Sequence, residues 1–106
     1  MTNNKIAKAL GFTETESCWV EYPSGIEVTK LPDFMHSMDV CIQYIVPRIK
    51  DHWAVGNTRC GKHKFICVIG VPDLDPFISE FGKTIPEAFC KAAYKYLEED
   101  NKQTIH

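Results

Sequence analysis

The sequence has no long apolar run, no glycine-rich phosphate-binding pattern and no regular cysteine spacing, and each absence excludes a class of protein. A membrane-spanning helix needs about 20 consecutive apolar residues, and no stretch of the chain approaches that length. Without a P-loop or a dinucleotide fingerprint, a nucleotide-hydrolysing or nicotinamide-dependent enzyme is not expected. The opening residues, MTNNKIAKALGF, lack the apolar core of a secretion signal, so a cytoplasmic protein is predicted.

Five cysteines occur at wide, irregular intervals, and an odd number without a framework pattern indicates reduced thiols rather than disulfide bonds. A formal net charge of −2 argues against a protein that gains its affinity by coating a nucleic-acid backbone. The chain of 106 residues is 44% hydrophobic and 25% charged, which is typical of a globular domain. We therefore predict a single domain over residues 1–106, with an ordered core over about residues 4–98.

The first third of the chain predicts a short helix followed by a β-hairpin. Asn3 can cap a helix that Gly11 ends, because glycine readily adopts the left-handed conformation found at helix C-termini. The β-rich stretches SCWVEY and IEVTKL flank the turn sequence Pro23-Ser24-Gly25. They therefore predict two antiparallel strands.

The stretch LPDFMHSMDV marks a change from strand to helix, and its polar residues could be a site or a hinge. Pro32 cannot donate to a sheet ladder, so the strand should end before it. Ser37 is the best N-cap, and Asp39 lies where the helix dipole favours an anion. We therefore interpret Asp33, His36 and Asp39 as parts of a hinge, in which His36 has no assigned role.

The helix that follows has one apolar stripe and an internal proline. Apolar residues recur at steps of three and four, as one buried helix face requires. They are Met38, Cys41, Ile42, Ile45 and Ile49. Pro47 removes one backbone hydrogen bond, so the helix should kink or end near it.

The second half predicts a hairpin, a further short strand and a long helix. WAV and HKFICVIGV flank a turn-rich connection, and FISEF adds a strand. The strand over residues 65–69 is apolar on both faces, so a central position with helices over both faces is expected. Thr84 and Glu87 predict a capping box in which Glu87 reaches back to the Thr84 amide. The helix behind it should bury Ala88, Phe89, Ala92, Ala93, Tyr96 and Leu97.

These elements predict an α+β fold in the order α-β-β-α-β-β-(β)-α. Connected hairpins imply antiparallel pairing, so we expect one mainly antiparallel sheet of four or five strands. The central strand is apolar on both faces, which predicts helices on both sides of that sheet. The expected fold is therefore an α/β/α sandwich.

This order of elements, the LPDF step and the closing stretch GKTIPEAFCKAAYKYLEED together resemble the phage ABA-sandwich domain family. These are small proteins of bacteriophages and prophages with helix–sheet–helix layering. The likeness runs from the Ile6 helix to Leu97, and Leu31-Pro32-Asp33-Phe34 matches the family's proline-aspartate-aromatic step. Pro47 departs from the uninterrupted second helix of the family. The resemblance implies a phage or prophage origin, hence the bacterial host cytoplasm, and it carries over no catalytic residue.

The C-terminal part of the chain has a second resemblance. The segment KFICVIGVPDLDPFISEFGKTIPEAFCKAAYKYLEED is similar to the amino-terminal domain of HicB-type antitoxins, in which a strand, a Pro-Asp-Leu turn, a short strand and a capped helix follow in that order. Those antitoxins usually add a DNA-binding segment, and none is visible after Leu97. The resemblance implies an antitoxin-like partner that masks a toxin.

One cluster of side chains could ligate zinc. His52, Cys60, His63 and Cys67 supply the imidazole and thiolate groups that suit this ion. Their spacing fits no standard finger or ribbon, and Cys67 belongs to an apolar strand. Packing is therefore the preferred interpretation, and no metal site is predicted.

Two further groups also have structural explanations. Asp73 and Asp75 could hold a divalent cation, but Asp-x-Asp-Pro is common turn chemistry. His36 and a cysteine could form a nucleophile pair, but the sequence has neither a glycine elbow nor an oxyanion loop. No catalytic residue and no cofactor are therefore predicted.

Basic residues are concentrated between Arg48 and Lys64. Those at the end of the second helix suit the helix dipole, and the others lie in or beside the next hairpin turn. If the two groups converge, they could bind a phosphorylated small molecule or an acidic protein edge. A solvated surface is the alternative. The candidate ligand-binding residues are Arg48, Lys50, Trp53, Arg59, Lys62 and Lys64.

The sequence therefore predicts a non-enzymatic protein that acts by stoichiometric binding. With the phage resemblance, the leading hypothesis is a counter-defence or host-modulating factor that sequesters a nucleotide immune signal or inhibits a host defence protein. The expected partner is a host protein or a small anionic, nucleotide-type ligand, and two chains could close one pocket as a homo-oligomer. Neither a membrane nor a nucleic acid is expected as a partner. A HicB-like, toxin-masking protein and a small hydrolase are the alternatives.

Overall fold

The computed structural model of the chain describes residues 1–21, 24–58, 64–71 and 77–103. Over these residues the protein has an α+β fold with three α-helices and two three-stranded antiparallel sheets, which confirms the predicted class. No helix in these ranges is long and apolar enough to cross a membrane. The elements, in chain order, are α1 Asn3–Leu10, β1 Phe12–Glu14, β2 Trp19–Glu21, β3 Glu27–Val28, α2 Met38–Tyr44, the 3-10 turn η1 Val46–Arg48, β4 Trp53–Asn57, β5 Phe65–Ile69, β6 Ile78–Gly82 and α3 Ile85–Gln103.

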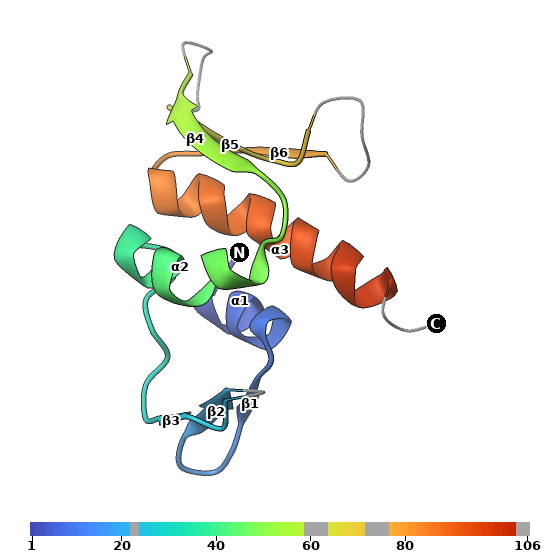
Figure 1. Cartoon of the computed structure of the whole chain (residues 1–106). Helices are drawn as coiled ribbons and strands as arrows, with labels where there is room; N and C mark the ends of the chain where they lie inside the picture. The colour runs from blue at the N-terminus through green and yellow to red at the C-terminus, as the bar shows by residue number, and fades with distance from the viewer. Residues whose placement is uncertain (22–23, 59–63, 72–76, 104–106) are drawn as a thin grey trace.

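Helix α3 is the central layer of the molecule (Figure 1). The β4–β5–β6 sheet lies on one side of it, and α1 and α2 lie on the other. The β1–β2–β3 sheet extends from the end of α1, away from α3. Because α3 is covered on two sides, its buried residues include the predicted set and also Cys90.

The strands form two sheets rather than the single sheet of four or five strands that the sequence predicts. Strand β1 was not expected, because a run of three residues is too short to show an alternating pattern. It pairs with β2, placing Phe12 opposite Glu21, and β2 pairs with β3 as the predicted hairpin. The LPDF step and α2 then separate β3 from β4, and within the described ranges no strand pairing joins the two sheets.

Strand β5 is central in its sheet, as predicted, but helices do not cover both of its faces. Cys67 and Ile69 are fully buried on the face toward α3. Ile66 and Val68, on the opposite face, are only half-buried. Because α1 and α2 pack on α3 instead of on the sheet, no helix of the described chain lies over this second face (Figure 1). The predicted helix–sheet–helix sandwich is not found in these residues.

The N-terminal helix begins one residue earlier than expected. Thr2, rather than Asn3, is the N-cap of α1, and its side chain accepts a hydrogen bond from the Lys5 amide at 3.3 Å. Gly11 ends the helix as predicted, with φ of 100°. Asn3 is therefore left free to bond elsewhere.

The second helix is short, for the reason that the sequence suggests. Ser37 caps α2 by accepting from the Val40 amide at 3.3 Å, and the helix gives way to η1, which contains Pro47. Cys41 and Ile45 of the predicted stripe are fully buried, whereas Ile42 is 51% exposed. Ile42 is turned about 100° from Cys41 around the helix axis, which carries it out of the contact with α3.

The third helix starts with the predicted cap, in a modified form. Thr84 Oγ1 accepts from the Glu87 amide at 3.2 Å, but the Glu87 carboxylate accepts from the Lys83 amide, at 3.3 Å, instead of from Thr84. Gly82 allows the close approach of β6 to this helix, because an added Cβ would lie 2.5 Å from the Ala88 nitrogen.

A cluster of three aromatic rings anchors the LPDF step to the rest of the fold. Phe34 is fully buried, and its ring centroid lies 6.2 Å from that of Phe12 and 5.9 Å from that of Tyr44. Phe12 and Tyr44 are 6.0 Å apart. The step therefore joins β1 and α2 through one buried side chain.

Candidate functional site

Arg48, a predicted ligand-binding residue, has a structural partner. Its guanidinium donates to the Leu10 carbonyl at the C-terminal end of α1. This end of a helix carries partial negative charge and unpaired carbonyl groups, so a cation stabilises it. The side chain is half-buried. The Arg48 guanidinium is therefore already engaged by the fold.

The other predicted residues are described only in part. Trp53 packs edge-to-face on Phe89, with ring centroids 5.0 Å apart. Lys50 and Lys64 have exposed side chains. Their backbone atoms are bonded, since the Lys50 amide donates to the Tyr96 hydroxyl at 3.2 Å and the Lys64 carbonyl accepts from the Thr58 amide at 2.9 Å. Two more predicted residues, Arg59 and Lys62, lie outside the described residues.

The structure describes only some of the residues that the sequence suggested as metal ligands or nucleophiles. Cys67 is fully buried against α3, while Cys60, His63, Asp73 and Asp75 lie outside the described ranges. Within those ranges no three His, Cys, Asp or Glu side chains are close enough to share a metal ion.

His36, which the sequence left without a role, is paired with Asp33. Its Nδ1 lies 2.9 Å from Asp33 Oδ1, and Asn3 Nδ2 donates to the same oxygen at 3.2 Å. These bonds, first that of His36 and then that of Asn3, lower the pKa of Asp33 below its ordinary value. Asn3 Oδ1 also accepts from the Met35 amide at 2.9 Å. The His36 side chain is 78% exposed and Cys41 is buried, so the fold does not form a His36–Cys41 nucleophile pair.

A hollow of about 450 Å³ lies beside this pair, at the start of α1 and of α3. A cationic Lys83, the His36 imidazole and the Thr84 hydroxyl can all contact an anionic or polar ligand there. Burial raises the pKa of Glu87, but hydrogen bonds from Lys91 and from the Lys83 amide outweigh it, so the Glu87 carboxylate ionises more readily than usual. The lining residues are Met1, Thr2, Asn3, Met35, His36, Lys83, Thr84 and Glu87.

Sequence reasoning missed this hollow because its walls come from three separate segments. The only local signal was the spacing of Asp33 and His36, which was assigned to a hinge. Their neighbour Asn3 is 30 positions away from Asp33 in the chain.

A partly exposed apolar surface lies on the side of the β4–β5–β6 sheet that faces away from α3, here called the outer sheet face. The register places Ala54 opposite Val68 and Ile66 opposite Phe81. Phe81 is 39% exposed. On the inner side, by contrast, Glu80 is bound by Lys95 of α3 at 3.1 Å. The outer sheet face consists of Ala54, Gly56, Ile66, Val68, Ser79 and Phe81.

Comparison with known proteins supports the fold and leaves the function open. No family of known proteins matches the chain, and no curated protein matches it either. The structure is similar to the crystal structure of a phage protein from Bacillus cereus ATCC 14579, with a TM-score of 0.65 and 22% sequence identity. The match covers 87% of this chain and 84% of that protein. The two proteins therefore share a fold over most of their length.

Proposed function

We propose that this chain is a small phage or prophage protein that acts without catalysis, by stoichiometric binding of a protein partner on the outer sheet face. The observation that carries the proposal is the half-burial of Ile66 and Val68 on the central strand of a sheet. A strand that is apolar on both sides is normally covered on both sides. Helix α3 covers one side, and a partner would cover the other.

The chemistry of the face favours a protein over a small ligand. Three strands about 4.8 Å apart and five residues long present a flat area of roughly 240 Å². Stable interfaces bury about 800 Å² per partner, so the face would be the apolar centre of a larger contact. Exposed Val71 and Phe77, at 42% and 43%, flank β5 and β6 and could extend it. A high apolar fraction, few charges and aromatic residues are typical of such a centre.

The charge beside the face favours an acidic partner. Lys64 directly precedes β5, and its side chain is exposed. The connection from β4 to β5 that ends at Lys64 also contains Arg59 and Lys62. Cations at an interface rim accelerate association with an acidic surface and add specificity.

The biological role follows from likeness to a phage protein, so it is part of the proposal. A phage protein of this size, acting in the bacterial host cytoplasm, would inhibit a host defence protein or otherwise modulate the host by occupying a surface. An antitoxin-like protein that masks a toxin would use the same mode of binding. Neither role needs a cofactor.

A second candidate is sequestration of a small anionic, nucleotide-type ligand in the hollow between the starts of α1 and α3. The observation that favours it is the presence of Lys83, His36 and Thr84 around one cavity of about 450 Å³. That volume lies within the range of small-molecule sites.

Native mass spectrometry of the chain isolated from expressing bacterial cells would identify the bound species. The identified protein is then titrated with purified chain by calorimetry. We expect Ile66→Ser and Val68→Ser each to weaken binding about tenfold or more, because each removes a buried apolar contact. Lys64→Glu should slow association and reduce its dependence on salt.

Ile42→Ser is the control, since Ile42 is an exposed isoleucine that lies on α2, away from the outer sheet face. It should bind like the unmodified chain. Equal binding by Ile66→Ser, Val68→Ser and Ile42→Ser would refute the outer sheet face as the site. If a nucleotide is bound and Lys83→Ala abolishes its binding, the hollow is the site instead. If the bound species is only a second copy of the chain, the protein is a homo-oligomer. Turnover of a nucleotide would indicate a hydrolase. Each of these three outcomes overturns the primary proposal.

A further inference from the structure

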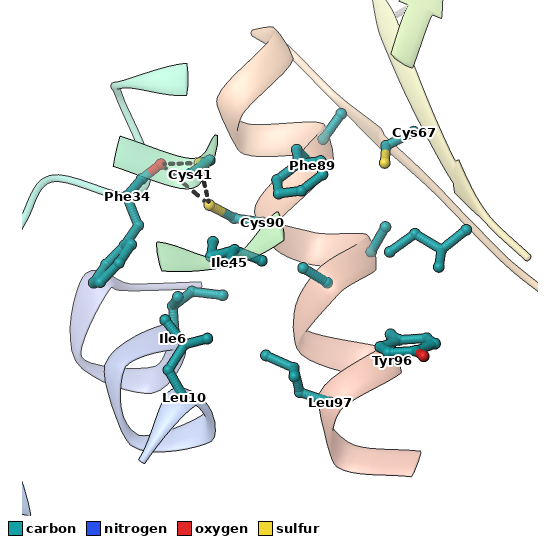
Figure 2. Packing of buried hydrophobic residues seen from close by; sticks show 14 of the residues in the cluster. Ile6, Leu10, Phe34, Cys41, Ile45, Cys67, Phe89, Cys90, Tyr96 and Leu97 are labelled. Carbon is teal, nitrogen blue, oxygen red and sulfur yellow. Dashed lines mark hydrogen bonds between the residues drawn. The ribbon is translucent and has the colours of Figure 1, made fainter. Parts of the chain in front are cut away.

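Two buried thiols from different helices meet at one backbone carbonyl. Cys41 Sγ on α2 lies 3.7 Å from Cys90 Sγ on α3. The Phe34 carbonyl oxygen is 3.1 Å from the first sulfur and 3.2 Å from the second. Figure 2 shows the three groups as a closed triangle between α2 and α3. Both cysteines have no exposed surface.

We infer that Cys41 and Cys90 are a redox-active dithiol, a modification site that a low-molecular-weight disulfide converts into an intramolecular disulfide joining α2 to α3. The two sulfurs of a disulfide are about 2.05 Å apart, so they need to approach by roughly 1.7 Å. Rotation of the two side chains and a small shift of α2 would have to supply this movement. Cys67, the other buried thiol described, lies on β5 across α3 from this pair (Figure 2).

The two thiols are not equivalent, which sets the order of the reaction. The hydrogen bond from Cys90 lowers the pKa of Cys41, and the same contact raises the pKa of Cys90. Cys41 therefore provides the first thiolate, the nucleophilic form of cysteine. It attacks one sulfur of the small disulfide, forms a mixed disulfide and expels one small thiolate. Cys90 then loses its proton and attacks Cys41 Sγ, which forms the internal bond and releases the second small thiol.

Access to the pair requires a local opening at α2 that leaves Cys41 and Cys90 in contact. Both sulfurs are covered in the closed fold, so a reagent reaches them only by local opening. Helix α2 has seven residues and ends at a proline-containing turn, which makes it too short to be stable alone. Oxidation should therefore be slow in buffer and faster in a low concentration of urea that leaves the molecule folded.

Oxidation changes the turn after Phe34 as well as the link between helices. Each thiol can donate to the Phe34 carbonyl, and a disulfide has no such hydrogen to give. The buried carbonyl loses both of these donors, which favours a rearrangement of this backbone. Phe34 is followed by Met35 and His36, so the redox state is coupled to the wall of the hollow.

The test uses the full chain, reduced and then incubated with glutathione disulfide. Remaining thiols are blocked with N-ethylmaleimide, and the protein is analysed by intact mass and by mapping of linked peptides. Apart from the N-ethylmaleimide added to the remaining thiols, we expect a loss of two hydrogens and a peptide link between Cys41 and Cys90 that dithiothreitol reverses. The amide resonances of Met35 and His36 should shift at the same time.

Variants separate this pair from the other cysteines. Cys18→Ala and Cys67→Ala should retain the link, whereas Cys90→Ala should stop at one glutathione on Cys41. A link from Cys41 or Cys90 to any other cysteine, or glutathione on another cysteine with no link between Cys41 and Cys90, would overturn the inference. The peptide map of the unmodified chain decides the question even if Cys90→Ala does not fold.

Discussion

The Arg48 guanidinium donates a hydrogen bond to the Leu10 carbonyl and thereby joins η1 to the end of α1. A residue that looks like part of a ligand site in the sequence is thus a link between two elements of the fold. We expect Arg48→Ala to lower the free energy of unfolding by about 1–2 kcal/mol, because a charge-assisted bond is lost and a helix end loses its cation. Urea unfolding at neutral pH measures the change.

Lys50→Ala is the control for this prediction. Its side chain is exposed, and replacing it should change the stability by less than about 0.5 kcal/mol. If Arg48→Ala had unchanged stability but lost partner binding, Arg48 would be a ligand residue and not a structural one.

Gly82→Ala should be strongly destabilising. The new methyl group would lie 2.5 Å from the Ala88 nitrogen and 2.9 Å from its Cα, both of which are backbone atoms of α3. Forcing β6 and α3 apart should cost about 1–3 kcal/mol. Gly56 provides a matched comparison in the same sheet, because an added Cβ there meets nothing within 4 Å. Gly56→Ala should be neutral or slightly stabilising, since alanine loses less backbone entropy than glycine on folding. Equal effects on the thermal midpoint would contradict the close approach at Gly82.

Phe34→Ala should disrupt the three-ring cluster. Phe34 has no exposed surface and contacts the rings of Phe12 and Tyr44, so its loss should cost roughly 3–5 kcal/mol. Phe77→Ala removes the same side chain from a position that is 43% exposed and should have a much smaller effect. Unfolding curves followed by tryptophan fluorescence and by circular dichroism compare the two variants.

The Asp33–His36 pair predicts a specific pH dependence. The pKa of Asp33 is lowered in the folded chain, mainly by the hydrogen bond from His36. Its contribution to stability is therefore complete above the pKa of the unfolded chain, and it disappears as the pH falls through the folded pKa. His36→Ala should raise the pKa of Asp33, and Asn3→Ala should do so by less. A carboxyl-carbon NMR titration measures both shifts, and an unchanged Asp33 curve in His36→Ala would exclude the pair in solution.

Features that depend on neighbours in sequence were the ones that could be predicted. Gly11, Ser37 and Thr84 mark helix ends as expected, because each acts on backbone groups within a few positions. Pro47 shortens α2 for an equally local reason. The Glu87 carboxylate was expected to accept from the Thr84 amide, but it accepts from the neighbouring Lys83 amide. A flexible carboxylate can reach either of these two amides.

The candidate site was less predictable than the helix ends. Of the predicted ligand residues, Arg48 and Trp53 are engaged by Leu10 and Phe89, which are far away in the chain. The hollow beside His36 was not anticipated, because its walls meet only after α1 and α3 have packed together.

The amino-acid sequence alone determined where most helices begin and end, and which residues are apolar enough for a core. It could not distinguish Cys67, which α3 buries, from Ile66, which remains half-exposed, because both lie on one apolar strand. Only the tertiary structure decided which side α3 covers and which thiols meet at Phe34. Burial of a side chain depends on which distant segments pack against it, and a local sequence pattern does not specify that packing.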